Sequence, residues 1–389
     1  MVKWLEKTLG EVTAFIAKGI PPKYTEEENE NTIRVLNQKC NRNFEISYNE
    51  SRIHDCEKKK VPADKMLRAG DVLINSTGTG TAGRVAQMVE VTVPTTIDGH
   101  MILIRPSEEL DPIYYGYAVK SFQAQIEGLA EGSTGQTEIN RRRLQDEVII
   151  RYPSDKLVQK NIGSFLANID EKIKTNKEIN KNLERQAQTI FKSWFIDFEP
   201  FSNRKPNDWS VSTLGNVSIM GAGGDKPQNV SPIKTDLYEY PIYSNGLSNE
   251  GLYGFTDKPK ISEESVTVSA RGTIGFVCLR HIPYVPIVRL VTLTPKTEII
   301  SAKYLYLWLK QLYITGTGTT QQQLTVPDFQ KTEILVPSQE IVTLFTATVD
   351  PIFEKIWANQ NENEKLSSLR DTLLPKLMSG ELDVSDLAL

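Results

Sequence analysis

A glycine-rich motif is the first segment of this sequence whose spacing suggests chemistry. Gly78-Thr79-Gly80-Thr81-Ala82-Gly83 matches the GxGxxG pattern and follows a β-rich run, as in loops that bind dinucleotide phosphates. A second copy of the segment, described below, has Ala270 in place of the first glycine, and neither copy leads directly into a clear helix. We therefore interpret the motif as a tight turn that needs the conformational freedom of glycine.

The residue types that usually form catalytic or metal centres are scattered along the chain. No CxxC or HxxxH spacing occurs, so we expect neither a metal site nor a disulfide framework, and the reducing cytoplasm is the expected compartment. The sequence has no Walker phosphate loop and no clear nuclease carboxylate cluster, so we expect no catalytic centre in this chain. The default interpretation of the histidines, His54, His100 and His281, is structural.

One further segment is faintly similar to a catalytic loop. Asp111-Pro112-Ile113-Tyr114 resembles the Asp-Pro-Pro-Tyr loop of amino-methyltransferases but lacks its second proline. The second copy, 301–304, has lost both the aspartate and the proline. Capping of a helix by Asp111, with Pro112 at the first helical position, explains the segment sufficiently.

The elements that position these residues occur twice. Trp4, Leu9-Gly10-Glu11-Val12, Gly19 and Pro22 recur as Trp209, Leu214-Gly215-Asn216-Val217, Gly224 and Pro227, at a constant offset of 205. Further matches follow in the same order, and near the ends Glu171-Lys172-Ile173 recurs as Glu354-Lys355-Ile356. A repeated order with drifting offsets is typical of a duplicated scaffold whose surface loops differ in length.

Each copy combines a globular head of mixed α and β structure with a long helix. Short β-rich runs bounded by Gly, Pro and Asp predict the strands, and one helix per head is expected near 112–129 and 301–313. We expect strands at 72–74, 101–104 and 148–150 in the first head, and at 266–269, 290–293 and 334–336 in the second.

The two long helices carry the apolar spacing of a coiled coil. Their a/d positions step by threes and fours, and each stripe has two asparagines near its middle. Antiparallel packing would let these asparagines satisfy one another, and the net charges of +3 (156–198) and −5 (339–389) favour that pairing. The pairing residues are Leu166, Ile169, Ile173, Asn176, Asn180, Leu183, Ile190 and Trp194 in the first helix, and Ile352, Ile356, Asn359, Asn363, Leu366, Leu373 and Leu377 in the second.

The alternative is two unrelated amphipathic helices, each packed on its own domain. Pro351 departs from the pattern, because it would either kink the second helix or mark its true start after Asp350.

Bulk properties fit a protein of two or three soluble domains. The 389 residues are 39% hydrophobic, and no apolar run is long enough for a membrane span. We expect no signal peptide, because Lys3, Glu6 and Lys7 lie among the apolar residues at 1–9. A net charge of −4 argues weakly against a nucleic-acid binder that acts alone.

The whole chain resembles the specificity subunits of type I restriction-modification enzymes. Phe191-Lys192-Ser193-Trp194-Phe195-Ile196-Asp197-Phe198 is similar to the central conserved region of that family, and 374–382 to its C-terminal region. The Trp and Leu-Gly-Glu-Val opening and the Gly-Ser-Thr-Gly-Gln segment at 132–136 agree. The resemblance divides the chain into target recognition domain 1 (1–155), a central conserved helix (156–198), target recognition domain 2 (199–338) and a C-terminal conserved helix (339–389).

The resemblance implies a non-catalytic subunit that reads double-stranded DNA. Each head would read one half of an asymmetric site, and the antiparallel helices would hold the heads apart and dock two modification subunits. The chain itself would bind no cofactor. The partners would methylate adenine N6 from S-adenosylmethionine, and restriction subunits would cleave DNA with ATP and Mg. The stripe from Leu166 to Trp194 is about 40 Å long, close to one turn of duplex.

Loops rich in hydrogen-bonding side chains are the candidates for reading DNA. Gln and Asn can pair with adenine, Arg with guanine, and Ser or Thr with either base or with phosphate. The alternative for each loop is a solvated surface. The candidates are Ser76, Thr77, Thr79, Arg84, Thr134, Gln136, Thr137, Asn140, Arg141 and Arg142 in head one, and Arg271, Thr273, Thr317, Thr319, Thr320, Gln321, Gln322 and Gln323 in head two.

Two other functions compete with this interpretation. A free-standing methyltransferase or nuclease would need the motifs that are missing. A coiled-coil adaptor that binds only proteins would show no specific binding to duplex DNA.

Overall fold

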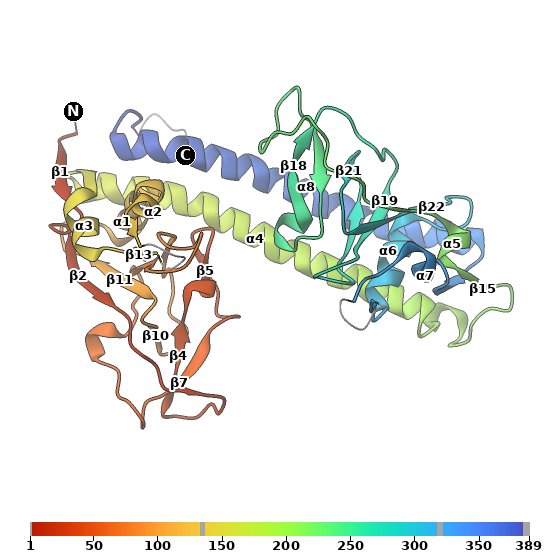
Figure 1. The fold of residues 1–389 in the computed structure, drawn as a ribbon, viewed down its shortest axis with the longest axis horizontal. Coiled ribbons are helices and arrows are strands. Elements are labelled where there is room, and N and C mark those ends of the chain that lie inside the picture. The colour runs from red at the N-terminus through yellow and green to blue at the C-terminus, as the bar shows by residue number, and fades with distance from the viewer. Residues whose placement is uncertain (1, 133–136, 317–321, 384–389) are drawn as a thin grey trace. The chain divides into compact units, whose positions relative to one another are not determined.

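The computed structural model describes residues 2–132, 137–316 and 322–383. The chain forms two compact units. Unit 1 comprises Met1–Asn176 and Asn361–Leu389, and unit 2 comprises Lys177–Gln360. Each unit therefore contains one head, part of the first long helix and part of the second (Figure 1). Among the described residues, no helix is long and apolar enough to cross a membrane.

The central sheet of unit 1 is antiparallel and is buried on both faces. Its two middle strands alternate between two hydrophobic clusters, with Val72 and Ile74 on one face and Leu73 on the other. This double burial explains why β8 and β11 appear in the sequence as continuous apolar runs. The sheet has the order β2 (Thr13–Lys18), β11 (Met101–Pro106), β8 (Val72–Asn75) and β9 (Val85–Gln87).

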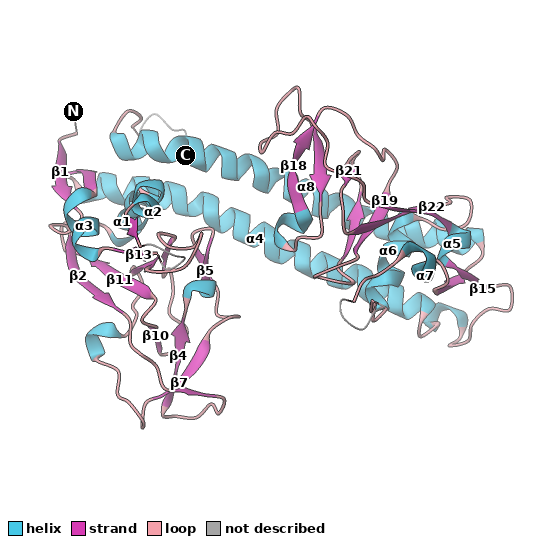
Figure 2. Ribbon diagram, in the orientation of Figure 1, coloured by secondary structure: helices cyan, strands magenta, loops and turns pink. Residues whose placement is uncertain are grey.

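Shorter elements complete head one (Figure 2). A second sheet has the order β10 (Thr95–Ile97), β4 (Thr32–Leu36), β7 (Arg52–Asp55) and β3 (Tyr24–Thr25). Paired strands are β1 (Trp4–Thr8) with β14 (Ile149–Pro153), β5 (Asn41–Arg42) with β6 (Glu45–Ile46), and β12 (Ala130–Glu131) with β13 (Glu138–Ile139). The helices are α1 (Pro112–Ser121), α2 (Gln123–Gly128) and α3 (Arg141–Glu147), and Asp111 caps α1 with Pro112 at its start, as expected.

The central sheet of unit 2 repeats that order. It consists of β16 (Ser218–Ala222), β22 (Leu290–Pro295), β19 (Ser265–Ser269) and β20 (Val277–Arg280). Around it lie β18 (Leu252–Thr256), β17 (Tyr240–Tyr243) and β21 (Val285–Pro286), the pair β15 (Ser210–Thr213) and β23 (Glu333–Val336), and helices α5 (Leu214–Val217), α6 (Ala302–Gln311) and α7 (Val326–Phe329). The predicted fold class, two repeated heads with two long helices, is confirmed.

Strand register corrects one detail of the repeat. In unit 1 the pairing of β2 with β11 shifts between Arg105 and Pro106, whereas no shift interrupts β16 with β22. The offset between corresponding residues of the two heads therefore falls from 205 to 204 after this shift in register. Gly19 and Gly223 are the true counterparts, because their N–H groups donate to Met101 and Leu290, the first residues of β11 and β22. The match of Gly19 with Gly224 is wrong by this one residue.

The long helices are α4 (Lys156–Phe195) and α8 (Gln339–Ser379). Because α8 begins at Gln339, the alternative in which the second helix starts after Asp350 is wrong. Pro351 lies inside the helix on its exposed side. A proline there cannot donate the usual backbone hydrogen bond. The apolar contacts of Phe353 and Ile356 in the core of unit 2 hold this part of α8 in place.

The helices pair antiparallel within each unit. In unit 1 Asn176 Nδ2 donates to Asn363 Oδ1 at 2.9 Å and to Glu362 Oε2 at 2.8 Å. In unit 2 Asn359 Nδ2 donates to Asn180 Oδ1 at 2.8 Å. The four asparagines thus form two hydrogen-bonded pairs, and packing of each helix only on its own domain is excluded.

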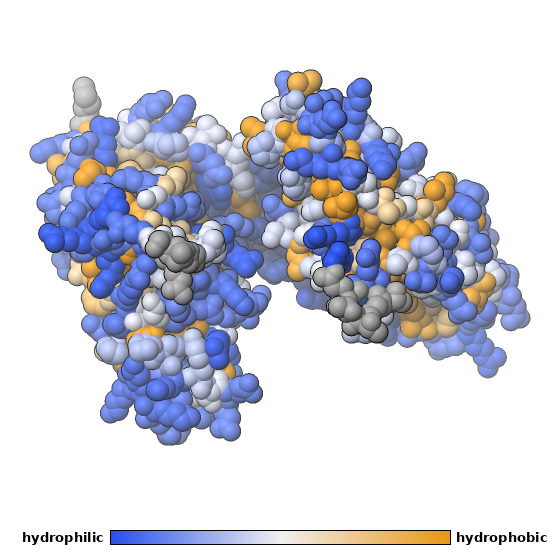
Figure 3. Space-filling model, in the orientation of Figure 1, coloured by the Kyte–Doolittle hydropathy of each residue, from blue (hydrophilic) through white to orange (hydrophobic). Residues whose placement is uncertain are grey.

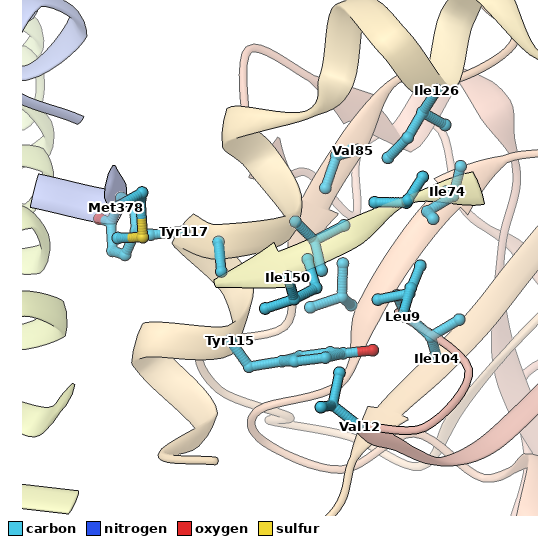
Figure 4. Close-up of a cluster of buried hydrophobic side chains, with 14 of the residues drawn as sticks. Leu9, Val12, Ile74, Val85, Ile104, Tyr115, Tyr117, Ile126, Ile150 and Met378 are labelled. Atoms are coloured by element: carbon cyan, nitrogen blue, oxygen red, sulfur yellow. The ribbon is translucent and has the colours of Figure 1, made fainter. Parts of the chain in front are cut away.

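The helix ends also complete the hydrophobic cores of the heads. None of the predicted pairing residues is exposed, but several of them pack on a head rather than only on the other helix. In unit 1 Leu374, Leu377 and Met378 of α8 join the core of head one, and Figure 4 shows Met378 beside Tyr117. In unit 2 Phe191 and Phe195 of α4 join the core of head two.

Candidate nucleic-acid interface

The glycine-rich segment is a tight turn between two strands in both heads. Gly80 and Gly83 have φ of 69° and 86°, and their counterparts Gly272 and Gly275 have 78° and 82°. These left-handed values favour glycine. In head one the turn leads into β9 rather than into a helix, so the structure agrees with a turn and argues against dinucleotide binding.

In each head this turn is joined to the second polar loop. The Ile139 N–H donates to the carbonyl oxygen of Ser76 at 2.7 Å. In head two the Leu324 N–H donates to the carbonyl oxygen of Ala270 at 2.8 Å. The loops that the sequence singled out, far apart along the chain, therefore meet at equivalent backbone positions. Ala270 is thus the counterpart of Ser76, and its match with Gly78 is wrong.

A third segment joins the same place. The Ser76 N–H donates to the carbonyl oxygen of His100 at 2.8 Å, and the Ala270 N–H donates to that of Arg289 at 2.8 Å. His100 and Arg289 each directly precede the central strand of their head. We call this meeting of three segments, at 76, 100 and 139 in head one and at 270, 289 and 324 in head two, the junction.

The junction of head one is supported by polar side chains. Gln38 Nε2 donates to Thr77 Oγ1 at 2.5 Å, and the same hydroxyl hydrogen-bonds His100 Nδ1 at 3.0 Å. Asp98 Oδ1 accepts from the His100 N–H at 2.9 Å, and burial raises the pKa of the Asp98 carboxyl. Lys18 forms an ion pair with Glu138. His100 is thereby held at an exposed position with both its backbone and its ring bound.

The junction of head two uses different side chains. Thr273 Oγ1 donates to the carbonyl oxygen of Asn245 at 2.6 Å. Asn245 Nδ2 donates to the carbonyl oxygen of Arg271 at 2.7 Å. The backbone scaffold is thus shared between the heads while the side chains on it differ.

The candidates of head one divide into buried supports and exposed groups. Ser76 is fully buried, so its side chain is an unsuitable contact for DNA. Arg84 donates to the carbonyl oxygen of Gly80 at 2.9 Å, and Asn140 caps α3, so both support the loops. Thr79, Arg141 and Arg142 are exposed, Thr77 and Thr137 are half-buried, and Thr134 and Gln136 lie outside the described residues.

The third arginine of the run in α3 is engaged. Arg143 forms ion pairs with Glu131 and Glu147, each at 2.6 Å. Among the described residues, Arg142 forms a long ion pair, 3.6 Å, with Asp146, and its side chain is 90% exposed. Arg141 and Arg142 are therefore the members of this run that fit a phosphate contact.

In head two Arg271 and Thr273 are half-buried and Gln322 and Gln323 are exposed. The candidates Thr317, Thr319, Thr320 and Gln321 lie outside the described residues. Figure 3 shows hydrophilic side chains over much of the visible face of head one, with more hydrophobic atoms on that of unit 2.

The structure adds residues that the sequence reasoning missed. Gln38, at the start of a short 3-10 helix (Gln38–Cys40), and Asn245, in a loop, carry no motif, so only the fold brings them to the junction. His100 and Arg289 each directly precede a strand that the repeat aligned, but no motif marks either of them. Within the described ranges, no group of three or more His, Cys, Asp or Glu could hold a metal ion.

Comparison with known proteins gives a family match in each copy of the repeat. Residues 1–185 and 206–368 match the family described as the type I restriction modification DNA specificity domain. The type I restriction enzyme MjaIX specificity subunit of Methanocaldococcus jannaschii is 30% identical over 304 residues, 71% of this chain and 69% of that protein. The HindI specificity subunit of Haemophilus influenzae is 27% identical over 312 residues, 59% of this chain and 68% of that protein.

A solved structure shares the fold. The crystal structure of a type I restriction-modification system S subunit from M. genitalium matches with a TM-score of 0.57 at 19% sequence identity. The match covers 97% of this chain and 96% of that one.

Proposed function

This chain belongs to the family of type I restriction modification DNA specificity domains and is a DNA sequence-recognition subunit, and on that premise we propose that each junction reads one half of a split site. The carrying observation is the repeated junction. Its backbone hydrogen bonds are the same in both heads, but its exposed side chains differ. A shared scaffold with unlike side chains fits two half-sites of different sequence.

The long helices have a different role in this proposal. Their asparagine pairs fix one antiparallel register, which supports a spacer of fixed length between the half-sites. We assign the docking of two modification subunits to the outer faces of α4 and α8. A near-neutral reader is sufficient if these partners supply much of the phosphate contact that dominates DNA affinity.

Catalysis belongs to the partner subunits in this proposal. The modification subunits would methylate adenine N6 using S-adenosylmethionine, and restriction subunits would cleave DNA with ATP and Mg. This chain would determine where on the DNA those reactions occur.

A gel-shift competition tests the proposal. The complex of this chain with its modification subunits is titrated onto labelled genomic fragments in the presence of excess unrelated duplex. We expect retention of a subset of fragments that share one split sequence. Equal competition by every duplex would contradict sequence reading and would favour the protein-only adaptor.

A further inference from the structure

Arg289 occupies an unusual backbone conformation beside the junction of head two. Its φ is 72°, in the left-handed region that a side chain such as arginine rarely adopts, and it is exposed. Its carbonyl oxygen accepts from the Ala270 N–H, so the strained residue lies within the junction itself. Strain of this kind persists where the surroundings enforce it, and it is concentrated at functional sites.

In each head a glycine packs closely against the segment that carries the junction residue, Arg289 or His100. A Cβ on Gly223 would lie 2.0 Å from the carbonyl oxygen of Ile287, and one on Gly19 would lie 2.1 Å from that of Asp98. Ile287 and Asp98 each stand two residues before the junction residue, Arg289 or His100. Gly19 and Gly223 therefore approach this backbone closely, and their contact holds in place the segment that carries His100 or Arg289.

A lysine lies beside the glycine-containing segment that follows β2 in head one and β16 in head two. Lys65 Nζ donates to the carbonyl oxygen of Gly19 at 3.4 Å. Lys260 Nζ lies 3.1 Å from the position that a Cβ on Gly224 would take, and the Gly224 N–H donates to the carbonyl oxygen of Pro286. A cation thus lies next to the glycine-containing segment in both heads, although not at the same glycine, and cations are what contact with DNA phosphates requires.

We propose that Arg289 contacts the DNA half-site read by head two and that His100 is its counterpart on the half-site read by head one. The inference rests on the proposed function and assigns it two residues that no sequence motif marks. A guanidinium can pair with guanine or with phosphate, and an imidazole can hydrogen-bond either a base edge or a phosphate.

The test uses three variants of Arg289 in the assembled complex with its modification subunits. Arg289→Ala removes the contact, Arg289→Lys keeps the charge but loses the planar fork, and Arg289→Gly removes the side chain while relieving the backbone strain. Ser202→Gly is the matched control. Ser202 is an exposed residue with φ 58° in unit 2, outside the junction. The probe is a duplex that carries the site methylated by the wild-type complex.

We expect Arg289→Ala and Arg289→Gly to weaken binding of that duplex about ten- to a hundredfold. The thermal midpoint of Arg289→Gly should not fall below that of the wild type, and Ser202→Gly should bind normally. With a base contact, Arg289→Lys would relax one position of a single half-site. With a phosphate contact, it would retain most of the affinity, and Arg289→Ala would lower the salt dependence of binding. His100→Ala should affect the other half-site.

Unchanged affinity, selectivity and salt dependence in Arg289→Ala, with a defined wild-type site, would overturn this inference alone. A wild-type complex that methylates no defined site would overturn the proposed function and this inference together.

Discussion

Leu377→Ala should destabilise head one selectively, although Leu377 lies near the end of the chain. The Leu377 side chain is fully buried in the core of unit 1, together with Leu374 and Met378. Truncation of a buried leucine to alanine costs about 2–5 kcal/mol. Even the lower value would raise the open population of the unit about 30-fold.

Hydrogen exchange measured segment by segment tests this prediction. Amides of β8 and β11 in unit 1 should exchange faster, whereas those of β19 and β22 in unit 2 should keep their wild-type rates. Leu369→Ala is the matched control, because Leu369 also lies on α8 in unit 1 but is 46% exposed. Its effect should remain within about 0.5 kcal/mol. Equal acceleration in both units, or none in β8 and β11, would refute the assignment of the α8 end to the core of head one.

Three further predictions concern the loops and the helices. Joint replacement of Gln321, Gln322 and Gln323 by Ala should relax one half-site and spare the other, as measured by sequencing of methylated sites; equal loss at both halves would count against independent heads. Asn359→Leu should lower the thermal midpoint, because Asn180 Oδ1 loses its donor. Asn180→Leu combined with Asn359→Leu should recover or exceed the wild-type midpoint, and a double variant less stable than the single one would contradict this reasoning. Deletion of matched turns from α4 and α8 should change the tolerated spacer without changing the half-sites, whereas an unchanged spacer would contradict a length-setting role.

Much of the fold could be predicted because the duplication is visible in local sequence patterns. Strands β8 and β19 appear as short β-rich runs before a glycine turn, and the stripes of α4 and α8 have helical spacing. An apolar stripe shows that a face is buried but not what covers it. The sequence therefore predicted helix pairing and missed that Leu374 and Met378 complete the core of head one.

The candidate site was predictable in outline only. Residue chemistry selected loops that the structure joins at the junction, but it did not separate supports from exposed groups. Ser76 and Asn140 have suitable side chains, yet one is buried and the other caps α3. Arg289 was missed because its significance lies in a backbone angle and a long-range hydrogen bond, neither of which leaves a local pattern.

Sequencing of methylated adenines in DNA exposed to the assembled complex tests the central claim most directly. The account predicts one split site whose two halves differ in sequence and are separated by a constant spacer. A palindromic site, a single uninterrupted site or methylation without sequence preference would contradict reading by two unlike heads.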